Sequence, residues 1–358
     1  MIQLPKLTMV TILLVFLTIS LAFDVNSYYY LARGEPVEQK TIPVGMHPLR
    51  IAINPNTDMI YVTNYQSHSI SVIDGSQDKL VANISSLLYP TDIFVDEKSN
   101  KIYVNHKARV EDQNQNQYSA MPLVSVIDGS TNKVIGNLSN AIEIKGVNPS
   151  RGELYVIQAS NTKALVVIDE STNIKIAEVN LNYYPSEIAM NQNTSELYVA
   201  NNESNSISKI DASTFDLVSS TINSAGIPVS MAVNPNTNRI YVASLNTSSM
   251  LSQPNVGAGI TLPSGFVSVV DGSTDQELAN IPLVSPSALA INSDTNIIYV
   301  ANSFSGTISI LSGSNNTIIS EDVKVGSSPQ DIAVNLNTDK VYVSNSFSNS
   351  VTVISHQD

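Results

Sequence analysis

The chain contains no cysteine and no tryptophan. The absence of cysteine excludes disulfide bonds, zinc–thiolate and iron–sulfur centres, and a thiol nucleophile. Lys and Arg number only 18 against 31 Asp and Glu, and they form no basic stripe, so nucleic-acid binding is not expected. The sequence also lacks a G-x-S-x-G elbow, a phosphate-binding glycine loop and an H-E-x-x-H pair. These absences favour a binding protein over an enzyme.

Residues that form strands and turns dominate what is present. Apolar residues make up 42% of the 358 residues, and Asn, Ser and Thr dominate the polar remainder. Asn, Ser and Thr are poor in helix interiors because their side chains compete for backbone hydrogen bonds, but they suit turns and strand surfaces. The composition therefore predicts an all-β chain with an apolar core.

One long apolar run stands near the N-terminus. It extends from Leu7 to Phe23, after Lys6 and before Asp24, and its length lies between that of a signal peptide and that of a membrane span. Small residues at Ser20 and Ala22 suit cleavage of a signal peptide, and an uncleaved signal anchor is the alternative. With either, we expect residues 24–36 to be a linker and residues 37–358 to lie outside the cytoplasmic membrane.

The rest of the chain repeats one motif, first seen as I-Y-V-T-N at Ile60–Asn64. Most copies are about 43 residues apart and two steps are longer, which is typical of four-stranded propeller blades. The repeated tyrosines are Tyr61, Tyr103, Tyr155, Tyr198, Tyr241, Tyr299 and Tyr342.

Each repeat divides into four strands, A to D. In the first repeat, A follows a proline (His47–Pro55), B carries the tyrosine, C alternates (Ser69–Gly75), and D follows an Asp-Gly turn. The last repeat ends with its C strand, and the missing D strand matches Gln39–Gly45. This pattern predicts a seven-bladed β-propeller with four antiparallel strands per blade. The N-terminal strand is expected to close the ring by pairing with the C-terminal blade.

The I-Y-V-T-N cores, N-P-N-T turns, S-V-I-D-G-S-T turns and V-G-x-x-P junctions resemble the YVTN-repeat β-propeller family over residues 37–358. This resemblance implies an archaeal or bacterial cell-surface or surface-layer protein that serves as a binding or scaffold module. Blade 3 departs from the pattern because Ile142–Gly152 lacks the junction proline.

The four-strand repeat assigns the loops to two faces of the disc. The A–B and C–D turns are short and share one face, here called the turn face. The B–C loops and D–A junctions share the other, the loop face. Two insertions, Lys107–Leu123 and Leu245–Phe266, fall in B–C loops and are expected to overhang the channel mouth. Neutral surface drift is the alternative.

Aromatic residues also gather on the expected loop face, where exposed rings are good anchors for a protein or glycan partner. Packing of each ring over the rim of the next blade is the alternative. The residues are Tyr65, Phe304 and Phe347 in B–C loops, and Tyr89, Tyr183 and Tyr184 at D–A junctions.

The second residue after each junction proline is expected at the channel mouth. Four of these are charged and are candidate ligand-binding residues: Arg50, Asp92, Glu187 and Asp331. An ordinary rim of mixed charge is one alternative. In propeller lactonases, carboxylates at the channel mouth hold a divalent ion. A second hypothesis is therefore a metal-assisted hydrolase that uses Asp92, Glu187 and Asp331.

Three histidines are placed on the same face: His47, His68 and His106. Neutral imidazoles that converge bind transition metals, although loop histidines are more often solvated. Six Asn-x-Ser/Thr sequons are candidate glycosylation sites in an exported chain: Asn83, Asn137, Asn193, Asn202, Asn246 and Asn315.

Together these patterns predict a secreted or membrane-anchored propeller that binds a protein or glycan through its loop face, as a monomer and without a cofactor. Contact with the membrane is expected only through the N-terminal segment. The alternatives are the metal-assisted hydrolase and a structural surface-layer component packed through the turn face.

Overall fold

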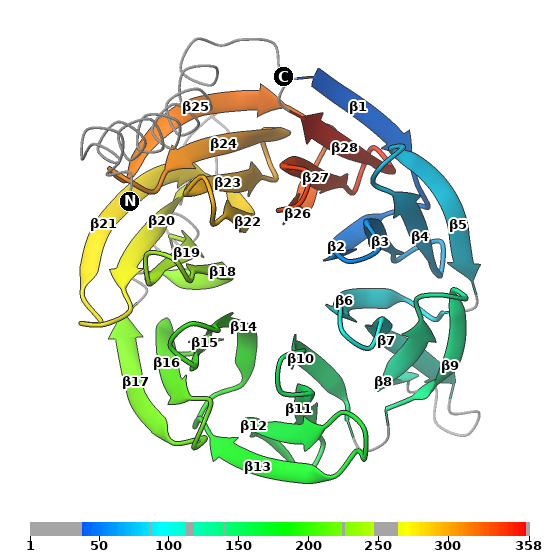
Figure 1. Cartoon of the computed structure of the whole chain (residues 1–358), viewed down its shortest axis with the longest axis horizontal. Coiled ribbons are helices and arrows are strands. Elements are labelled where there is room, and N and C mark those ends of the chain that lie inside the picture. Colours follow the sequence, from blue (N-terminus) through cyan, green and yellow to red (C-terminus); the bar gives the residue numbers. More distant parts are fainter. Residues whose placement is uncertain are drawn as a thin grey trace, which may run out of the picture.

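A computed structural model describes residues 38–85, 87–111, 118–138, 141–223, 226–246 and 264–355. These residues form 28 strands arranged as seven four-stranded antiparallel sheets in a ring around a central axis (Figure 1). The predicted seven-bladed β-propeller is therefore confirmed. Nothing within the described ranges forms a helix long and apolar enough to span a membrane. The expected export segment (1–23) and linker (24–36) lie outside these ranges.

Every blade has the same order of strands from the channel outward. The strands of blades 1 to 4 are β2 (Pro48–Asn54), β3 (Met59–Asn64), β4 (Ser69–Asp74), β5 (Lys79–Ser85); β6 (Pro90–Asp96), β7 (Lys101–Glu111), β8 (Tyr118–Asp128), β9 (Lys133–Asn137); β10 (Glu143–Asn148), β11 (Glu153–Gln158), β12 (Asn161–Asp169), β13 (Lys175–Asn180); β14 (Pro185–Asn191), β15 (Glu196–Asn201), β16 (Ser206–Asp211) and β17 (Leu217–Asn223). Those of blades 5 to 7 are β18 (Ile227–Asn234), β19 (Arg239–Leu245), β20 (Ser264–Asp271), β21 (Glu277–Val284); β22 (Pro286–Asn292), β23 (Ile297–Asn302), β24 (Thr307–Ser312), β25 (Thr317–Lys324); β26 (Pro329–Asn335), β27 (Lys340–Asn345), β28 (Ser350–Ser355) and β1 (Glu38–Pro43).

Blade 7 contains both ends of the propeller. Its outer strand β1 pairs antiparallel with β28, with Thr41 opposite Thr352 and Ile42 opposite Val351. The predicted closure of the ring is therefore confirmed, and it removes the free edge that β28 would otherwise present.

The apolar core lies between blades rather than within one. Between blades 7 and 1, Ile42 and Val353 pack with Ile60 and Val62, and each of the other six interfaces has a similar cluster. The seven repeat tyrosines are the largest fully buried side chains, with exposures of 2% or less. A blade therefore depends on its neighbours for burial of its apolar faces.

Asparagine side chains fasten adjacent blades on the turn face. The last residue of an inner strand donates from its amide nitrogen to the A–B turn of the next blade, as between Asn54 and Asn100 at 2.7 Å. Four further interfaces repeat this bond, and the one from Asn335 to Asp58 closes the ring. All five acceptors have a positive φ near 55°, which Asn and Asp tolerate better than other side chains with a Cβ.

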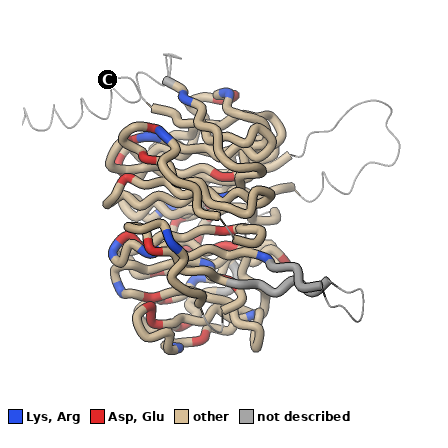
Figure 2. Tube along the Cα trace, turned by 90° about the vertical axis from the view of Figure 1, so that its right-hand side faces the viewer, with Lys and Arg blue, Asp and Glu red and all other residues tan. Residues whose placement is uncertain are grey.

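The C–D turns of blades 1 to 5 begin with an aspartate that caps its own turn. Its carboxylate accepts the backbone N–H groups two and three residues later, as at Asp169 with Ser171 and Thr172. Seen edge-on, acidic positions line the left side of the disc (Figure 2). The capping aspartates are Asp74, Asp128, Asp169, Asp211 and Asp271.

The blade 2 insertion differs from the expected loop. Strands β7 and β8 continue into it, with Lys107 opposite Pro122 and Glu111 opposite Tyr118, so that it forms an extended hairpin. The prediction of a loop was wrong here because the ladder of blade 2 can simply be lengthened. Residues 247–263 of the blade 5 insertion lie outside the described ranges.

Candidate functional site

A cavity of about 630 Å³ lies off-centre in the channel, at the inner strands of blades 7, 1, 2, 3 and 4. The structure brings together here all four charged residues predicted for the channel mouth: Arg50, Asp92, Glu187 and Asp331. Ser230 holds the corresponding position in blade 5, but it is buried and its hydroxyl accepts the Leu289 N–H at 3.2 Å. The polar groups are therefore concentrated on one side of the ring.

Irregular backbone at the start of the inner strands places these side chains. The β-ladder shifts register directly after the junction proline, between Pro48 and Ile51 in β2 and between Pro329 and Asp331 in β26. Proline has no N–H to give to the ladder, and a bulge re-aims the side chains that follow it. The residue two positions after the proline is thereby freed to face the channel.

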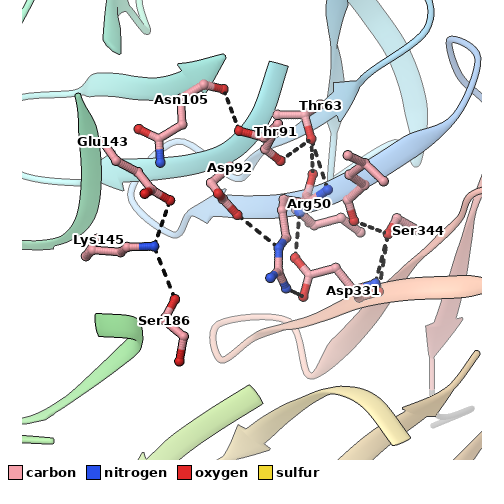
Figure 3. A network of polar contacts seen from close by, with 12 residues as sticks. Arg50, Thr63, Thr91, Asp92, Asn105, Glu143, Lys145, Ser186, Asp331 and Ser344 are labelled. Atoms are coloured by element: carbon pink, nitrogen blue, oxygen red, sulfur yellow. Dashed lines mark hydrogen bonds and ion pairs between the residues drawn. The ribbon is translucent and has the colours of Figure 1, made fainter. Parts of the chain in front are cut away.

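Arg50 lies between two carboxylates from the neighbouring blades (Figure 3). Its Nε donates to Asp92 Oδ1 at 3.0 Å, and its Nη1 lies 3.6 Å from Asp331 Oδ1. Burial alone would lower the pKa of the Arg50 guanidinium. The nearby carboxylates of Asp331, Glu187 and Asp92 have a larger effect in the opposite direction and raise this pKa above its usual value. Arg50 is therefore a permanent cation at the centre of the acidic side chains.

Asp331 also supports the seam between blades 7 and 1. Its Oδ2 accepts the Ile51 N–H at 2.8 Å. Burial raises the pKa of Asp331, while Arg50 and the Ile51 and Ile332 amides act in the opposite direction. This carboxylate is committed to the architecture of the ring.

Glu187 differs from the other carboxylates of the cavity. Within the described part of the chain, its side chain has no hydrogen bond or ion pair at contact distance. Burial raises its pKa to about 7; Arg50 partly offsets this effect, and Asp331 and Asp92 add to it. Glu187 therefore changes protonation near neutral pH.

Blade 3 contributes a second charged group that the proline pattern did not reveal. Lys145 Nζ lies 2.7 Å from Glu143 Oε1 and donates to the Ser186 carbonyl at 3.2 Å (Figure 3). The Tyr184 ring centroid is 5.2 Å from Nζ, and its hydroxyl donates to Glu143. The signal available was the missing proline of blade 3 together with the charge alternation in Glu-Ile-Lys.

The carboxylates of the cavity outnumber its cations. Arg50 and Lys145 face five acidic residues: Asp92, Glu143, Glu187, Glu203 and Asp331. Asp92 and Asp331 share the single positive charge of Arg50, and Glu143 pairs with Lys145, whereas Glu187 and Glu203 have no ion pair at contact distance in the described structure. The cavity consequently favours a cationic guest.

The described residues contain no group of three or more carboxylates or imidazoles that could hold a metal ion. Two of the three carboxylates proposed for a divalent ion, Asp92 and Asp331, instead flank the guanidinium of Arg50, which occupies the position between them. The residues present therefore do not fit the ion that a metal-assisted hydrolase would require.

Five rings form a row across blades 7, 1 and 2 on the loop face, which we call the aromatic row. Phe347, His47, Tyr65, Tyr89 and His68 follow one another with centroid separations of 6.2, 6.0, 5.2 and 4.3 Å. These spacings are those of interacting ring pairs. The row contains three of the aromatic residues predicted for this face: Phe347, Tyr65 and Tyr89. Phe347 is exposed, as expected of an anchor for a partner, whereas Tyr65 and Tyr89 are half-buried and pack against neighbouring rings.

The remaining predicted aromatic residues lie apart from this row. Phe304 is exposed in the β23–β24 loop, Tyr183 is exposed at the junction before β14, and Tyr184 lines the cavity. No ring contact from Phe304 or Tyr183 is seen among the described residues.

The three histidines have separate partners. His47 Nδ1 is 2.9 Å from Ser346 Oγ, and His68 Nδ1 accepts the Tyr89 N–H at 3.1 Å. His106 is buried in the extended hairpin with Nε2 2.7 Å from Ser125 Oγ, and burial lowers its pKa. These contacts show packing roles and do not assemble the three imidazoles around a metal.

Five of the six sequon asparagines are exposed: Asn83, Asn137, Asn193, Asn202 and Asn315. The Asn193 amide donates to the Pro235 carbonyl of the next blade, which commits it to the seam on the turn face. Asn202 lines the cavity and accepts from Ser186 Oγ at 2.6 Å. Asn246 is half-buried beside the blade 5 insertion. Glycosylation itself remains a prediction.

Comparison with known proteins supports the fold alone. No protein-family model matches the chain, and no curated protein matches it. Among solved structures, a chain described as Kuenenia stuttgartiensis hydrazine synthase superposes with a TM-score of 0.72 at 18% identity, covering 87% of this chain and 96% of that one. The chain thus has the fold of a seven-bladed β-propeller, and its resemblance to the YVTN-repeat family remains a prediction.

Proposed function

We propose that this chain is an exported β-propeller, secreted or anchored by its N-terminal segment, whose loop face binds a protein partner without catalysis. The aromatic row is the observation that carries the proposal. Its terminal ring, Phe347, is 73% exposed, and the neighbouring junctions add Met46 and Leu88 at 52% and 48% exposure. Rigid exposed rings beside flexible apolar side chains are the usual anchors of protein interfaces.

The aromatic row lies close to the cavity along the chain. His47 and Tyr89 stand three residues before Arg50 and Asp92, a separation of at most roughly 10 Å. A partner seated on the row would therefore also reach the cavity. Such a combination of apolar anchors with a few polar groups supports recognition of a partner.

Capture experiments with the full-length chain, tagged at its C-terminus, test the binding function. Because an aromatic anchor contributes on the order of 2 kcal/mol or more, Phe347→Ala combined with Tyr65→Ala should weaken capture from an extract at least about 30-fold. Ile174→Ala, at an exposed position directly before the outer strand β13 of blade 3, is the matched control and should leave capture unchanged.

Equal capture by the ring variant and the parent would contradict the use of this face. If capture survives protease treatment of the extract but is lost after removal of glycans, the partner is a glycan instead. Sedimentation velocity tests the surface-layer alternative, since a monomer at high concentration argues against packing between copies.

Export has its own test. Cell fractionation should place the chain outside the cytoplasm, and sequencing of its N-terminus distinguishes cleavage after Ala22 from an uncleaved anchor. Recovery of the intact chain in the cytoplasm would overturn the export proposal.

A further inference from the structure

The cavity contains an acidic group whose charge the fold leaves without a partner. Arg50 is matched by Asp92 and Asp331, and Lys145 by Glu143, but no cation contacts the Glu187 carboxylate among the described residues. The Glu187 side chain is partly buried, and ionisation of a carboxylate that has lost part of its water lowers stability unless a partner replaces that water. Its presence beside open space points to a guest that supplies the missing positive charge.

The walls of the cavity indicate the size and character of that guest. Apolar residues, including Ile51, Ile93, Ile188 and Phe94, line it beside the charged groups. Its volume of about 630 Å³ is typical of sites for small organic ligands. A guest that fits both features has an apolar stem and a cationic head.

A metal ion fits these walls poorly. A small divalent cation needs several oxygen ligands at about 2.0–2.6 Å, whereas the described carboxylates form no such set. Lys145 already lies 5.2 Å from the Tyr184 ring centroid, which shows that this part of the wall accepts an ammonium group beside an aromatic face.

We propose that the cavity binds an ammonium or guanidinium group carried on an aliphatic chain, with Glu187 as its counter-charge. This inference rests on the proposed binding function and names the group that the site recognises. The same chemistry has two sources, a Lys or Arg side chain of the protein partner and a free diamine.

Calorimetric titration of the full-length chain tests the proposal with four probes: Nα-acetyl-lysine methylamide, its neutral norleucine analogue, 1,5-diaminopentane and CaCl2. We expect the lysine probe or the diamine to bind and the norleucine analogue to bind at least 10-fold more weakly, because a bond between two charged groups is lost. Binding of the lysine probe assigns the site to a partner side chain, and binding of the diamine alone assigns it to a free small molecule.

Glu187→Gln should reduce affinity for the cation about 10- to 100-fold, since it removes the charge and keeps the shape. Glu321→Gln makes the same change of net charge on the exposed outer strand β25 and should have no effect. For the parent chain, affinity should also rise with pH from 6 to 8 as Glu187 ionises. This pH profile remains informative even if the Gln variant folds poorly.

Equal binding of the lysine and norleucine probes would overturn the proposal. So would binding of Ca²⁺ alone, or an affinity that neither Glu187→Gln nor pH changes. If capture of the partner depends on the aromatic row but neither the lysine probe nor the diamine binds, this inference fails and the binding function stands. If capture is independent of the aromatic row while the cation still binds, the proposed use of the aromatic row fails and the assignment of a cation site to the cavity stands.

Discussion

At the scale of single residues, Glu187 connects the cavity to the stability of the ring. Its pKa is raised from the usual 4.5 to about 7 in the folded chain. The folded state therefore holds this proton more tightly than the unfolded chain, and stability falls as pH rises from about 4.5 to about 7, then levels off. Glu187→Gln should remove this slope and stabilise the chain at pH 8 by about 1–3 kcal/mol. Denaturant unfolding at several pH values measures both effects, and an unchanged slope would contradict them.

The repeat tyrosines are equivalent in sequence but not in their hydroxyl environments. Tyr198 donates to Glu196 Oε2 at 2.9 Å, whereas the buried Tyr61 hydroxyl has no hydrogen-bond partner in the described structure. Tyr198→Phe should therefore cost about 0.5–1.5 kcal/mol, and Tyr61→Phe should be neutral or slightly stabilising, since it removes a polar atom that burial leaves unsatisfied. Urea unfolding of the two variants compares them directly. A larger loss for Tyr61→Phe would refute this assignment.

The spacing of residues predicted where four cavity charges lie but not how they pair. Counting from each junction proline is enough to find Arg50, because the repeat fixes the position along the strand. The position of Arg50 between Asp92 and Asp331 depends on bulges and on the side-chain geometry of three blades. Lys145 was not predicted because blade 3 lacks the proline from which the count begins.

At the scale of elements, strand β1 closes the ring by pairing with β28. Its Ile42 is 4% exposed and packs between blades 7 and 1, while Lys40 on the same strand faces solvent. Ile42→Asp places a charge in an apolar core and should destabilise the chain by at least about 3 kcal/mol. Lys40→Ser, the control, should change stability by less than about 0.5 kcal/mol. Thermal unfolding separates the two, and similar melting temperatures would argue that β1 contributes little to closure.

The strands themselves followed well from the sequence, since each alternates or lies between turn residues with a known φ preference. The exception is the blade 2 insertion, where β7 and β8 extend by pairing with each other. A hairpin of this kind forms its backbone hydrogen bonds between its own two strands. It therefore needs no contact with the disc, and the repeat pattern does not predict it. The cation pairs between blades, such as Lys340 with Asp78 at 3.0 Å, were not predicted either, because they join residues of different repeats that lie far apart in the sequence.

At the scale of the whole molecule, the capped C–D turns set the response to acid. Their hydrogen bonds lower the pKa of all five capping aspartates, that of Asp169 to about 2. Stability from these groups is present above the usual value of 3.8 and is lost as pH falls towards 2. We expect stability to fall in this window, and to fall less when Asp128, Asp169 and Asp211 are all changed to Asn. Circular dichroism during acid titration measures it, and parallel curves would disprove a role for the turns.

The pairing of β1 with β28 also dictates an order of events during synthesis. A ribosome makes Thr41 early and Thr352 some three hundred residues later, yet the two lie opposite each other. Contacts so distant along the chain are slow to form, because a long loop must close before they contribute. The six sheets with consecutive strands can pair as they emerge, while the nascent β1 stays without its partner until β28 has been made. The pairing of β1 with β28 is therefore the last step in the assembly of the ring.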